Sequence, residues 1–401
     1  MRVSTATTRG RAGEVAAAFL WLGLTSFGGP VAHLGYFRRA FVQQRRWLDE
    51  EHFSQLLALC QFLPGPASSQ LGFSIGLLRA GWLGGLAAFV GFTLPSALLL
   101  FGFALASRAL DGGWGQALVH GLKLVAVAVV LHGVVGMART LAPDWTRRAM
   151  ALAAALLVLA SGAPWMQLVL VAGGALAGRW LCRGVAARTG GMFALAWGRR
   201  TGAVLVALFV LGLGVAFLPG LPPLGRAAAA FYRAGALVFG GGHVVLPLLK
   251  ASVVDPGWLD NNTFLAGYGA AQAVPGPMFT LASFLGARLP GGMGGAPGAT
   301  VAVLAIFAPG LLLVAGALPF WRALAQRTGA ARALAGVNAV VVGLLAAAFV
   351  NPVAASAIHA PLDVLVAAAG VLMLLARWPA LAVVGWCVAA TLAQALFAQG
   401  M

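Results

Sequence analysis

The sequence predicts an all-α integral membrane protein of about 13 transmembrane helices, in two inverted-topology repeats with helices broken at the midplane of the bilayer. Three observations carry this prediction: the composition, a series of apolar segments, and an internal repeat. Of the 401 residues, 61% are hydrophobic and 9% are charged. A water-soluble domain has roughly a quarter of its residues charged, so this composition excludes one.

Apolar segments long enough to enter a membrane follow one another along the whole chain. Arg2, Arg9 and Arg11 precede the first segment, and no small-residue cleavage site follows a short apolar run, so we expect an uncleaved helix rather than a signal peptide. The pairs at 148–182 and 362–398 are short for full spans. The segments lie near residues 14–37, 50–78, 83–106, 117–138, 148–161, 165–182, 202–218, 227–249, 263–287, 298–320, 333–350, 362–376 and 379–398.

The positive charge predicts the orientation of the chain, because cytoplasmic loops hold an excess of Lys and Arg. The chain carries 26 Lys and Arg against 9 Asp and Glu. A cytoplasmic N-terminus and a periplasmic C-terminus place 17 basic residues inside and 8 outside, with Lys123 inside a helix. We therefore expect a multi-pass membrane protein with this orientation. The basic residues are spread over short loops, so lipid is an expected partner and nucleic acid is not.

One loop breaks this charge rule. It holds Arg38, Arg39, Arg45 and Arg46, and the predicted topology puts it outside. Two interpretations stay open: a face that contacts solvent or lipid headgroups, and an electropositive vestibule that concentrates anions.

The chain repeats itself after a little more than half its length. Gly23, Phe27, Gly28 and Gly29 recur 212 positions later as Gly235, Phe239, Gly240 and Gly241. At a shift of 211, Trp47, Leu48, Asp49, Phe53, Gln61, Pro64, Gly65 and Pro66 recur as Trp258, Leu259, Asp260, Phe264, Gln272, Pro275, Gly276 and Pro277. An odd number of crossings separates the copies, which predicts that the second is inverted. We expect repeats at 1–195 and 226–401, joined by a transmembrane helix within 196–225.

Each repeat contains two motifs that interrupt a helix. The Phe-Gly-Gly motif interrupts the first helix of each copy, and Pro-Gly-Pro interrupts the second helix near the expected midplane of the membrane. A half-helix should start after each Pro-Gly-Pro, with unpaired N–H groups and the positive end of its dipole available to an anion. Taken alone, either motif could be a proline kink or a helix-packing patch, but their joint recurrence indicates a central polar site.

The expected substrate site combines these motifs with the few polar residues of the apolar segments. Gln61 and Gln272 could bind a ligand or the freed carbonyls. His33 and His243 are expected to satisfy unwound backbone rather than carry protons. Lys123, with Asn338 as its counterpart, could line the site or extend toward the surface. The expected site residues are Phe27, Gly28, Gly29, Gln61, Pro64, Gly65, Pro66, Ser68, Ser69, Lys123, Gly240, Gly241, His243, Gln272, Pro275, Gly276, Pro277 and Asn338.

No catalytic residue, metal ligand or cofactor is expected. The nine acids lie at predicted segment ends or in loops, and the three cysteines, Cys60, Cys182 and Cys387, are far apart, so an intramembrane enzyme is not supported. The sequence alone indicates an anion transporter, with an anion channel as the rival.

At FGGP (Phe27 to Pro30), FLPGPASSQLG (Phe62 to Gly72), FGGGHVVLPLL (Phe239 to Leu249) and AVPGPMF (Ala273 to Phe279), the sequence resembles the chromate ion transporter family in its two-repeat form. The resemblance covers nearly the whole chain. It implies an inner-membrane exporter of chromate, and of sulfate-like oxyanions, that confers chromate resistance. Single-repeat members act as pairs, and a homodimer of this chain stays open. The charge of a dianion suggests export driven by the membrane potential, and proton-coupled antiport is the alternative.

Overall fold

The computed structural model describes residues 10–27, 29–107, 113–161, 166–185, 193, 195, 197–239, 245–321, 323 and 327–399. In these ranges the chain is helical and contains no strand. The helices of the first half are α1 (Ala12–Thr25), α2 (Gly29–Phe37), α3 (Glu50–Phe62), α4 (Ala67–Ala106), α5 (Gly113–Leu141), α6 (Trp145–Ser161) and α7 (Met166–Leu181), followed by α8 (Arg199–Val215).

The second half presents a similar order of helices. They are α9 (Pro223–Ala236), α10 (Val245–Leu249), α11 (Asn261–Ala273), α12 (Leu281–Arg288), α13 (Gly295–Ala317), α15 (Thr328–Ala348), α16 (Ala355–Ala357), α17 (Pro361–Leu375) and α18 (Ala380–Gln399). Short π-helical segments at Arg38–Gln44, Lys250–Val254 and Phe349–Ala354, and 3₁₀ turns at Met278–Thr280 and Leu318–Phe320, join some of them. Each predicted apolar segment therefore contains a helix.

The starts of α3 and α11 show why local sequence produces matching elements. Each helix has 13 residues and follows an aspartate in extended conformation. Asp49 accepts a hydrogen bond from the backbone N–H of His52, and Asp260 accepts one from Thr263. These side chains satisfy N–H groups that a helix start leaves free. The bond from His52 also lowers the pKa of the Asp49 carboxyl.

The first half begins with two helical hairpins that open toward the same end of the molecule. Arg79 forms an ion pair with Glu14 in the first turn of α1, at 3.2 Å. The Arg79 guanidinium also lies 5.2 Å from the ring centre of Trp47, just before α3. Phe41, just after α2, stacks on both Phe19 of α1 and Trp47. The start of α1, the end of α2, the start of α3 and residue 79 of α4 therefore meet at one end.

This arrangement differs from the expected single crossings at 14–37 and 50–78, because each stretch turns back on itself. The α1–α2 turn lies at the Phe-Gly-Gly motif, and the turn between α3 and α4 lies at Pro64–Pro66. A third reversal occurs inside α4, where Ala80 and Gly81 leave the helical conformation. Residues 67–79 then pack against 82–106, since a Cβ on Gly76 would lie 2.8 Å from Cβ of Ala88.

The second half contains corresponding hairpins. A side chain on Gly267 of α11 would collide with the ring of Phe284 of α12, so these two helices lie against each other across the second Pro-Gly-Pro break. The π-helical segment 250–254 contacts α9 as well as α10 and α11. Such contact requires the chain to turn back between α9 and this segment. The stretches 227–249 and 263–287 are therefore also folded back.

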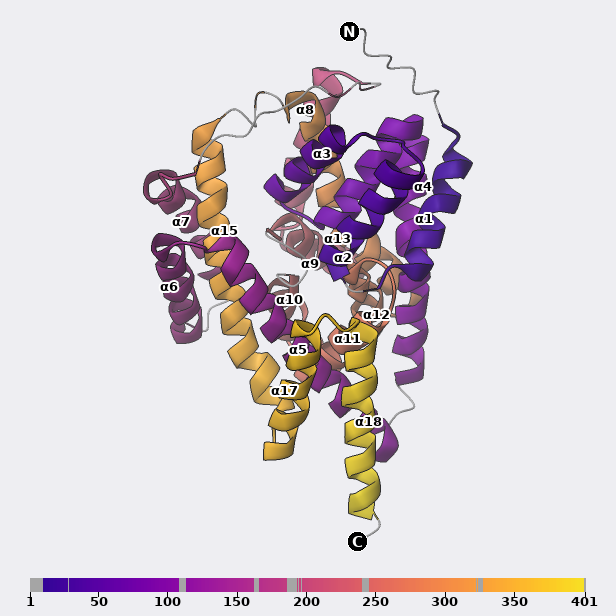
Figure 1. The fold of residues 1–401 in the computed structure, drawn as a ribbon, viewed down its shortest axis with the longest axis vertical. Coiled ribbons are helices and arrows are strands. Elements are labelled where there is room, and N and C mark those ends of the chain that lie inside the picture. The colour runs from indigo at the N-terminus through magenta and orange to yellow at the C-terminus, as the bar shows by residue number, and fades with distance from the viewer. Residues whose placement is uncertain are drawn as a thin grey trace.

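The later helices of each half pack against helices of the other half. α5 packs along α17 and α18 of the second half, whereas α15 packs along α6 and α7 of the first half; Figure 1 shows α6 and α7 beside α15 and the other pair beside α5. Glycines permit close approach at both contacts. Gly121 of α5 lies against the backbone of Val388, and Gly336 of α15 lies against Gly174 and Gly178. Each half therefore completes its packing with helices of the other half.

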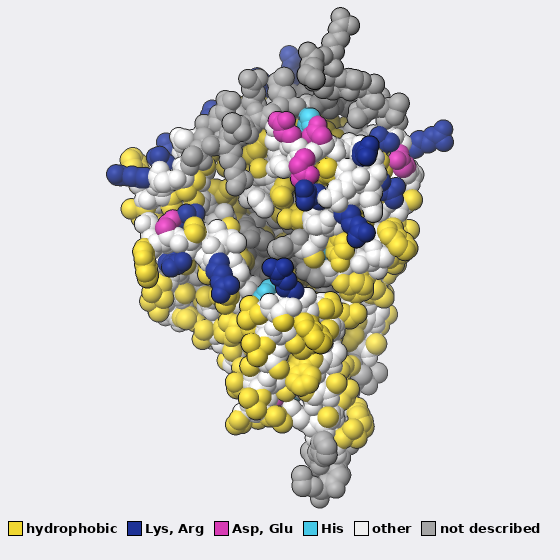
Figure 2. Space-filling view, in the orientation of Figure 1, with side chains coloured by type: hydrophobic (Ala, Val, Ile, Leu, Met, Phe, Trp, Pro, Cys, Tyr) yellow, Lys and Arg dark blue, Asp and Glu magenta, His cyan; other side chains and the backbone are white. Residues whose placement is uncertain are grey.

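The outside of the helices is apolar, as a lipid-facing surface requires. Trp21 and Trp180 are 66% and 68% exposed, and leucines on α4, α8 and α17 are exposed as well. In Figure 2, hydrophobic side chains cover the lower part of the face, while Lys and Arg lie across its upper and middle part. In the part of the chain that the structure describes, four helical stretches are long and apolar enough to cross a membrane: Ala67–Ala106, which includes the reversal at Ala80 and Gly81, and Trp114–Leu141, Gly295–Phe320 and Thr328–Ala357.

Candidate functional site

The first Pro-Gly-Pro break is the closed tip of the α3–α4 hairpin. Gly65 has φ +125° and its backbone N–H donates to the carbonyl oxygen of Val238 at 2.7 Å. A Cβ at this position would lie 2.9 Å from Cα of Gly310 in α13. Both the backbone conformation and the close approach therefore require glycine here.

The second break repeats this geometry with the halves exchanged. Gly276 has φ +99° and its backbone N–H donates to the carbonyl oxygen of Ser26 at 2.9 Å. A Cβ on Gly276 would lie 2.9 Å from Oγ of Ser96 in α4. Ser26 and Val238 each directly precede a Phe-Gly-Gly motif. Each Pro-Gly-Pro tip therefore contacts the hairpin that contains the Phe-Gly-Gly motif of the other half.

The half-helix after the first break has polar groups at its start. The first helical hydrogen bond runs from the N–H of Gln70 to the carbonyl of Pro66, which leaves the N–H groups of residues 67–69 without a helical acceptor. Ser68 and Ser69 are buried, and Ser69 Oγ has no hydrogen-bond partner. In the second copy the corresponding hydroxyl, on Thr280, donates to the carbonyl of Pro277 at 2.6 Å.

The glutamines before the two breaks differ from each other. Gln61 is exposed, whereas Gln272 is buried and donates to the sulfur of Met278 at 3.0 Å. Another residue, Gln70, bonds the freed carbonyls: its Nε2 donates to Pro64 at 2.9 Å and to Gly310 at 3.0 Å. Our sequence reasoning missed Gln70 because its counterpart in the second repeat is Leu281.

His33 lies beside the second break. Its Nε2 is 3.2 Å from the carbonyl oxygen of Ser26, so Nε2 carries the hydrogen and donates. Its ring meets Phe92 edge to face at 5.2 Å. His33 thus bonds backbone at the interruption of the first hairpin, in agreement with its expected role. Phe27 is partly buried at this interruption, and Gly29 begins α2. The expected site residues Gly28, Gly240, Gly241 and His243 lie outside the described residues.

The contacts of Lys123 place it away from the breaks. Its side chain is 7% exposed, and Nζ donates to Oδ1 of Asn262 at 3.1 Å. Asn262 is in the first turn of α11, whereas Pro275 follows the last turn, about 20 Å further along at 1.5 Å per residue. The Lys123 ammonium is thus buried and bonded at the start of α11. Asn338 of α15 is partly buried and its Oδ1 has no partner.

Asp363 lies at the start of an apolar segment, as expected for the acids, but it is buried by another helix. It lies in the first turn of α17 but is only 3% exposed. One carboxylate oxygen is 2.8 Å from Nε2 of His120, and the other accepts the N–H groups of His359 and Ala360. An aspartate two residues after the helix-starting Pro361 signals the cap, but its burial depends on α5.

Two prolines inside helices could have been detected as part of the repeat. Pro95 of α4 recurs as Pro309 of α13 at a shift of 214, which pairs Ser96 with Gly310. Ser96 contacts the second break and Gly310 the first. The longer turn at 289–294 changes the shift from 211, which hides the match from a search at constant spacing.

Comparison with known proteins identifies the family of this fold. The sequence model of the chromate transporter family matches the chain twice, over residues 13–179 and 225–393. This chain belongs to the chromate transporter family. The two matches lie on either side of α8. Members of this family are transporters, and the apolar helices described above agree with a multi-pass membrane protein.

Several named chromate transporters are similar over most of their length. The probable chromate transport protein of Synechococcus elongatus is 29% identical over 341 residues, which cover 83% of this chain and 82% of that protein. The chromate transport protein of Pseudomonas aeruginosa is 28% identical and covers 84% and 80%. That of Cupriavidus metallidurans is 27% identical and covers 83% and 80%. No solved structure matches this chain.

Proposed function

We propose that this chain exports chromate, or a related tetrahedral oxyanion such as sulfate, through a site where the two Pro-Gly-Pro tips meet the opposite hairpins. The reciprocal bonds from Gly65 to Val238 and from Gly276 to Ser26 carry the proposal. Non-helical backbone at membrane depth is tolerated where protein or a polar cavity satisfies it. The half-helix starts supply N–H groups for an anion. The names of the similar proteins support chromate as the substrate.

We further propose that the two halves, 1–195 and 226–401, have inverted topology and are linked by α8 within 196–225. If the four hairpins enter the membrane and return, the complete spans are residues 82–106 of α4, then α5, α6, α7, α8, α13, α15, α17 and α18. Nine spans keep the N-terminus cytoplasmic and the C-terminus periplasmic. The first half and α8 contribute five of them, an odd number, so the second half enters from the opposite side.

The distribution of basic residues supports this topology. The hairpins move Arg38, Arg39, Arg45 and Arg46 to the cytoplasmic side and Lys250 to the periplasmic side. The split between the two sides then changes from 17 and 8 to 20 and 5. The loop that broke the charge rule now obeys it. In this loop, Arg38 forms an ion pair with Glu50 at 2.7 Å, and the Arg45 guanidinium lies over the ring of Trp47. These contacts support a location at the membrane interface rather than in a vestibule that concentrates anions.

The driving force we propose is the membrane potential. At about 2.3 kcal/mol per charge per 100 mV, a dianion leaving a cell at roughly 150 mV gains about 7 kcal/mol. At about 1.4 kcal/mol per tenfold change, this energy supports a gradient on the order of 10⁵. Such a gradient is sufficient for detoxification without a coupled ion.

Reconstituted liposomes test this function. A potassium diffusion potential and a pH gradient are imposed separately, and flux of labelled chromate is measured with and without excess sulfate. We expect saturable flux that follows the potential at zero pH gradient and that sulfate reduces. Flux that follows only the pH gradient would contradict uniport, and flux that never saturates would indicate a channel. Protein-free liposomes and the Gly65→Leu variant are the controls.

A further inference from the structure

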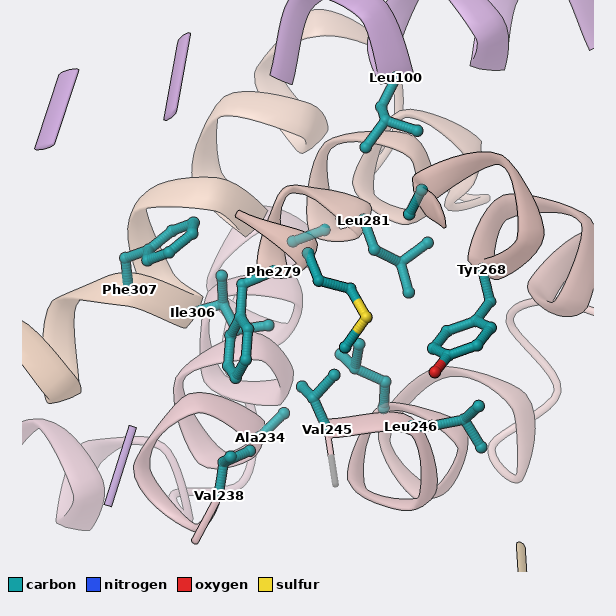
Figure 3. Close-up of a cluster of buried hydrophobic side chains, with 14 of the residues drawn as sticks. Leu100, Ala234, Val238, Val245, Leu246, Tyr268, Phe279, Leu281, Ile306 and Phe307 are labelled. Atoms are coloured by element: carbon teal, nitrogen blue, oxygen red, sulfur yellow. The ribbon is translucent and has the colours of Figure 1, made fainter. Parts of the chain in front are cut away.

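The two halves of the site differ in chemistry although they share a backbone arrangement. Around the tips, the first half supplies Ser26, His33, Gln70 and Thr93, all buried. At shifts of 211 to 214, their counterparts in the second half are Val238, Val245, Leu281 and Phe307. Figure 3 shows these four apolar side chains within one buried hydrophobic cluster, beside Phe279 and Ile306. Among the described residues near the tips, buried polar side chains are therefore more numerous in the first half, although Gln272 and Thr280 lie in the second.

Several side-chain hydroxyls of the first half lack hydrogen-bond partners. Among the described residues, the hydroxyls of Ser26, Ser69 and Thr93 are buried and unbonded. Their side chains are 0%, 4% and 3% exposed. Leaving a buried polar group unsatisfied costs about 1–3 kcal/mol, so such groups in a native protein require an explanation. Three in one region indicate a ligand that bonds them when present.

These residues lie on helices that pack together. Ser26 ends α1, and its carbonyl accepts bonds from Gly276 and His33. Thr93 follows Phe92, whose ring contacts His33 and whose carbonyl lies beside Gly276. Ser69 is in the first turn of the half-helix that starts at Ala67, and Gly72 of the same half-helix packs on Phe19 and Phe37. The α1–α2 hairpin and the two parts of α4 therefore form one bundle with these hydroxyls near its tips.

Building on the proposed function, we propose that the oxyanion binds on the first-half bundle, held by the hydroxyls of Ser26, Ser69 and Thr93 together with the free N–H groups of residues 67–69. Hydrogen bonds from hydroxyl and N–H donors to an anion are charge-assisted and stronger than neutral ones. Neutral donors also bind a dianion without the persistent attraction of a fixed cation, which helps release. The apolar cluster that contains Val238, Val245, Leu281 and Phe307 then forms the opposing wall. One anion binds per chain, although the backbone arrangement occurs twice.

The test compares hydroxyls that have a partner with hydroxyls that have none. The variants Ser26→Ala, Ser69→Ala and Thr93→Val remove the unbonded hydroxyls at little change of volume. The matched controls are Ser283→Ala and Thr391→Val, whose hydroxyls donate to the carbonyls of Ala97 and Cys387. Full-length protein in detergent is titrated with sodium chromate by calorimetry, and its unfolding temperature is measured without chromate.

We expect each of the first three variants to weaken chromate binding by about tenfold, the loss of one hydrogen bond to a charged group. Their unfolding temperature without chromate should stay the same or rise, because an unsatisfied group is removed. The two controls should bind chromate within about twofold of the wild type and unfold at a lower temperature. Unchanged chromate affinity in all three variants, with binding by the wild type intact, would overturn this inference alone. Failure of the wild type to bind would overturn the proposed function and this inference with it.

Discussion

The backbone N–H of Gly276 donates to the carbonyl oxygen of Ser26 at 2.9 Å, across 250 positions of the sequence. The tip of one half is thereby fixed to the interrupted hairpin of the other, and Gly65 and Val238 form the matching bond. Because both tips are held by backbone, a displacement of one hairpin alters the surroundings of the opposite tip. A coupling of this kind is what a transporter with alternating access requires.

The hairpin topology predicts which loops face the cytoplasm. Single cysteines at Gln44 and Pro256, both exposed, are introduced into protein lacking the three buried native cysteines. In intact spheroplasts a membrane-impermeant maleimide should label the cysteine at 256 and reach the one at 44 only after permeabilisation. A reporter fused after Arg200 should be cytoplasmic, and one fused after Met401 should be periplasmic. Labelling of both cysteines in intact spheroplasts would contradict the α1–α2 hairpin and support a single membrane crossing at 14–37.

Replacing the glycine at either tip should lower the stability of the protein through packing, independently of anion binding. Gly65→Ala and Gly276→Ala should destabilise the protein by about 2–4 kcal/mol each, because a left-handed backbone is strained by a Cβ and that Cβ meets Gly310 or Ser96. The control is Gly220→Ala, which has φ +75° and nothing within 4 Å of its Cβ, and should cost about 1 kcal/mol. Thermal unfolding in detergent measures all three. Equal losses in the three variants would mean that close approach is unimportant.

The position of the Lys123 ammonium group predicts the effect of replacing this residue. Because its ammonium group bonds Asn262, about 20 Å along α11 from the second break, Lys123→Met should leave chromate resistance within about twofold of the wild type. Removing a buried charge together with its polar partner is often neutral, so the double variant Lys123→Met with Asn262→Leu should accumulate normally. Survival on chromate plates and membrane abundance give the two readouts. Loss of chromate resistance at normal membrane abundance would indicate that Lys123 belongs to the substrate site.

The Asp363 carboxylate should stabilise the contact between α5 and α17. Asp363→Ala removes the acceptor of two backbone N–H groups and of His120, and should cost about 2–4 kcal/mol in unfolding free energy. His120→Gln, which keeps a donor on α5, should cost less. Unfolding temperatures of the two variants compare these costs. If His120→Gln is the more damaging, then His120 has a role beyond bonding Asp363.

Sequence patterns predicted the helices well because helix formation here depends on local features. The caps at Asp49 and Asp260 and the breaks at both Pro-Gly-Pro motifs can be read directly from the residues. The direction that the chain takes after each break could not be predicted from the residues, because a proline break is equally compatible with a kink and with a reversal. The excess of arginine at 38–46 was the one sequence signal of reversal, because it conflicted with a straight crossing.

Sequence recurrence selects the backbone motifs of the candidate site, but it does not select several of the side chains that lie beside them. Ser26, Gln70 and Thr93 have apolar counterparts, and a search for recurrence selects residues that are the same in both copies. Lys123 was selected for being a lysine in an apolar segment, but its partner Asn262 depends on the packing of α5 against α11. Contacts between elements 139 or 243 positions apart cannot be derived from spacing along the chain.

The exchange of helices between the halves has a consequence for biosynthesis. α5 emerges from the ribosome well before its partners α17 and α18, and His120 precedes Asp363 by 243 positions. At about 5–20 residues per second, α5 waits roughly 12 to 50 seconds for them. During that time the insertion machinery or lipid must shield the unpaired face of α5. The same dependence means that a truncated first half, made alone, should be recognised by membrane proteases as an unfinished product.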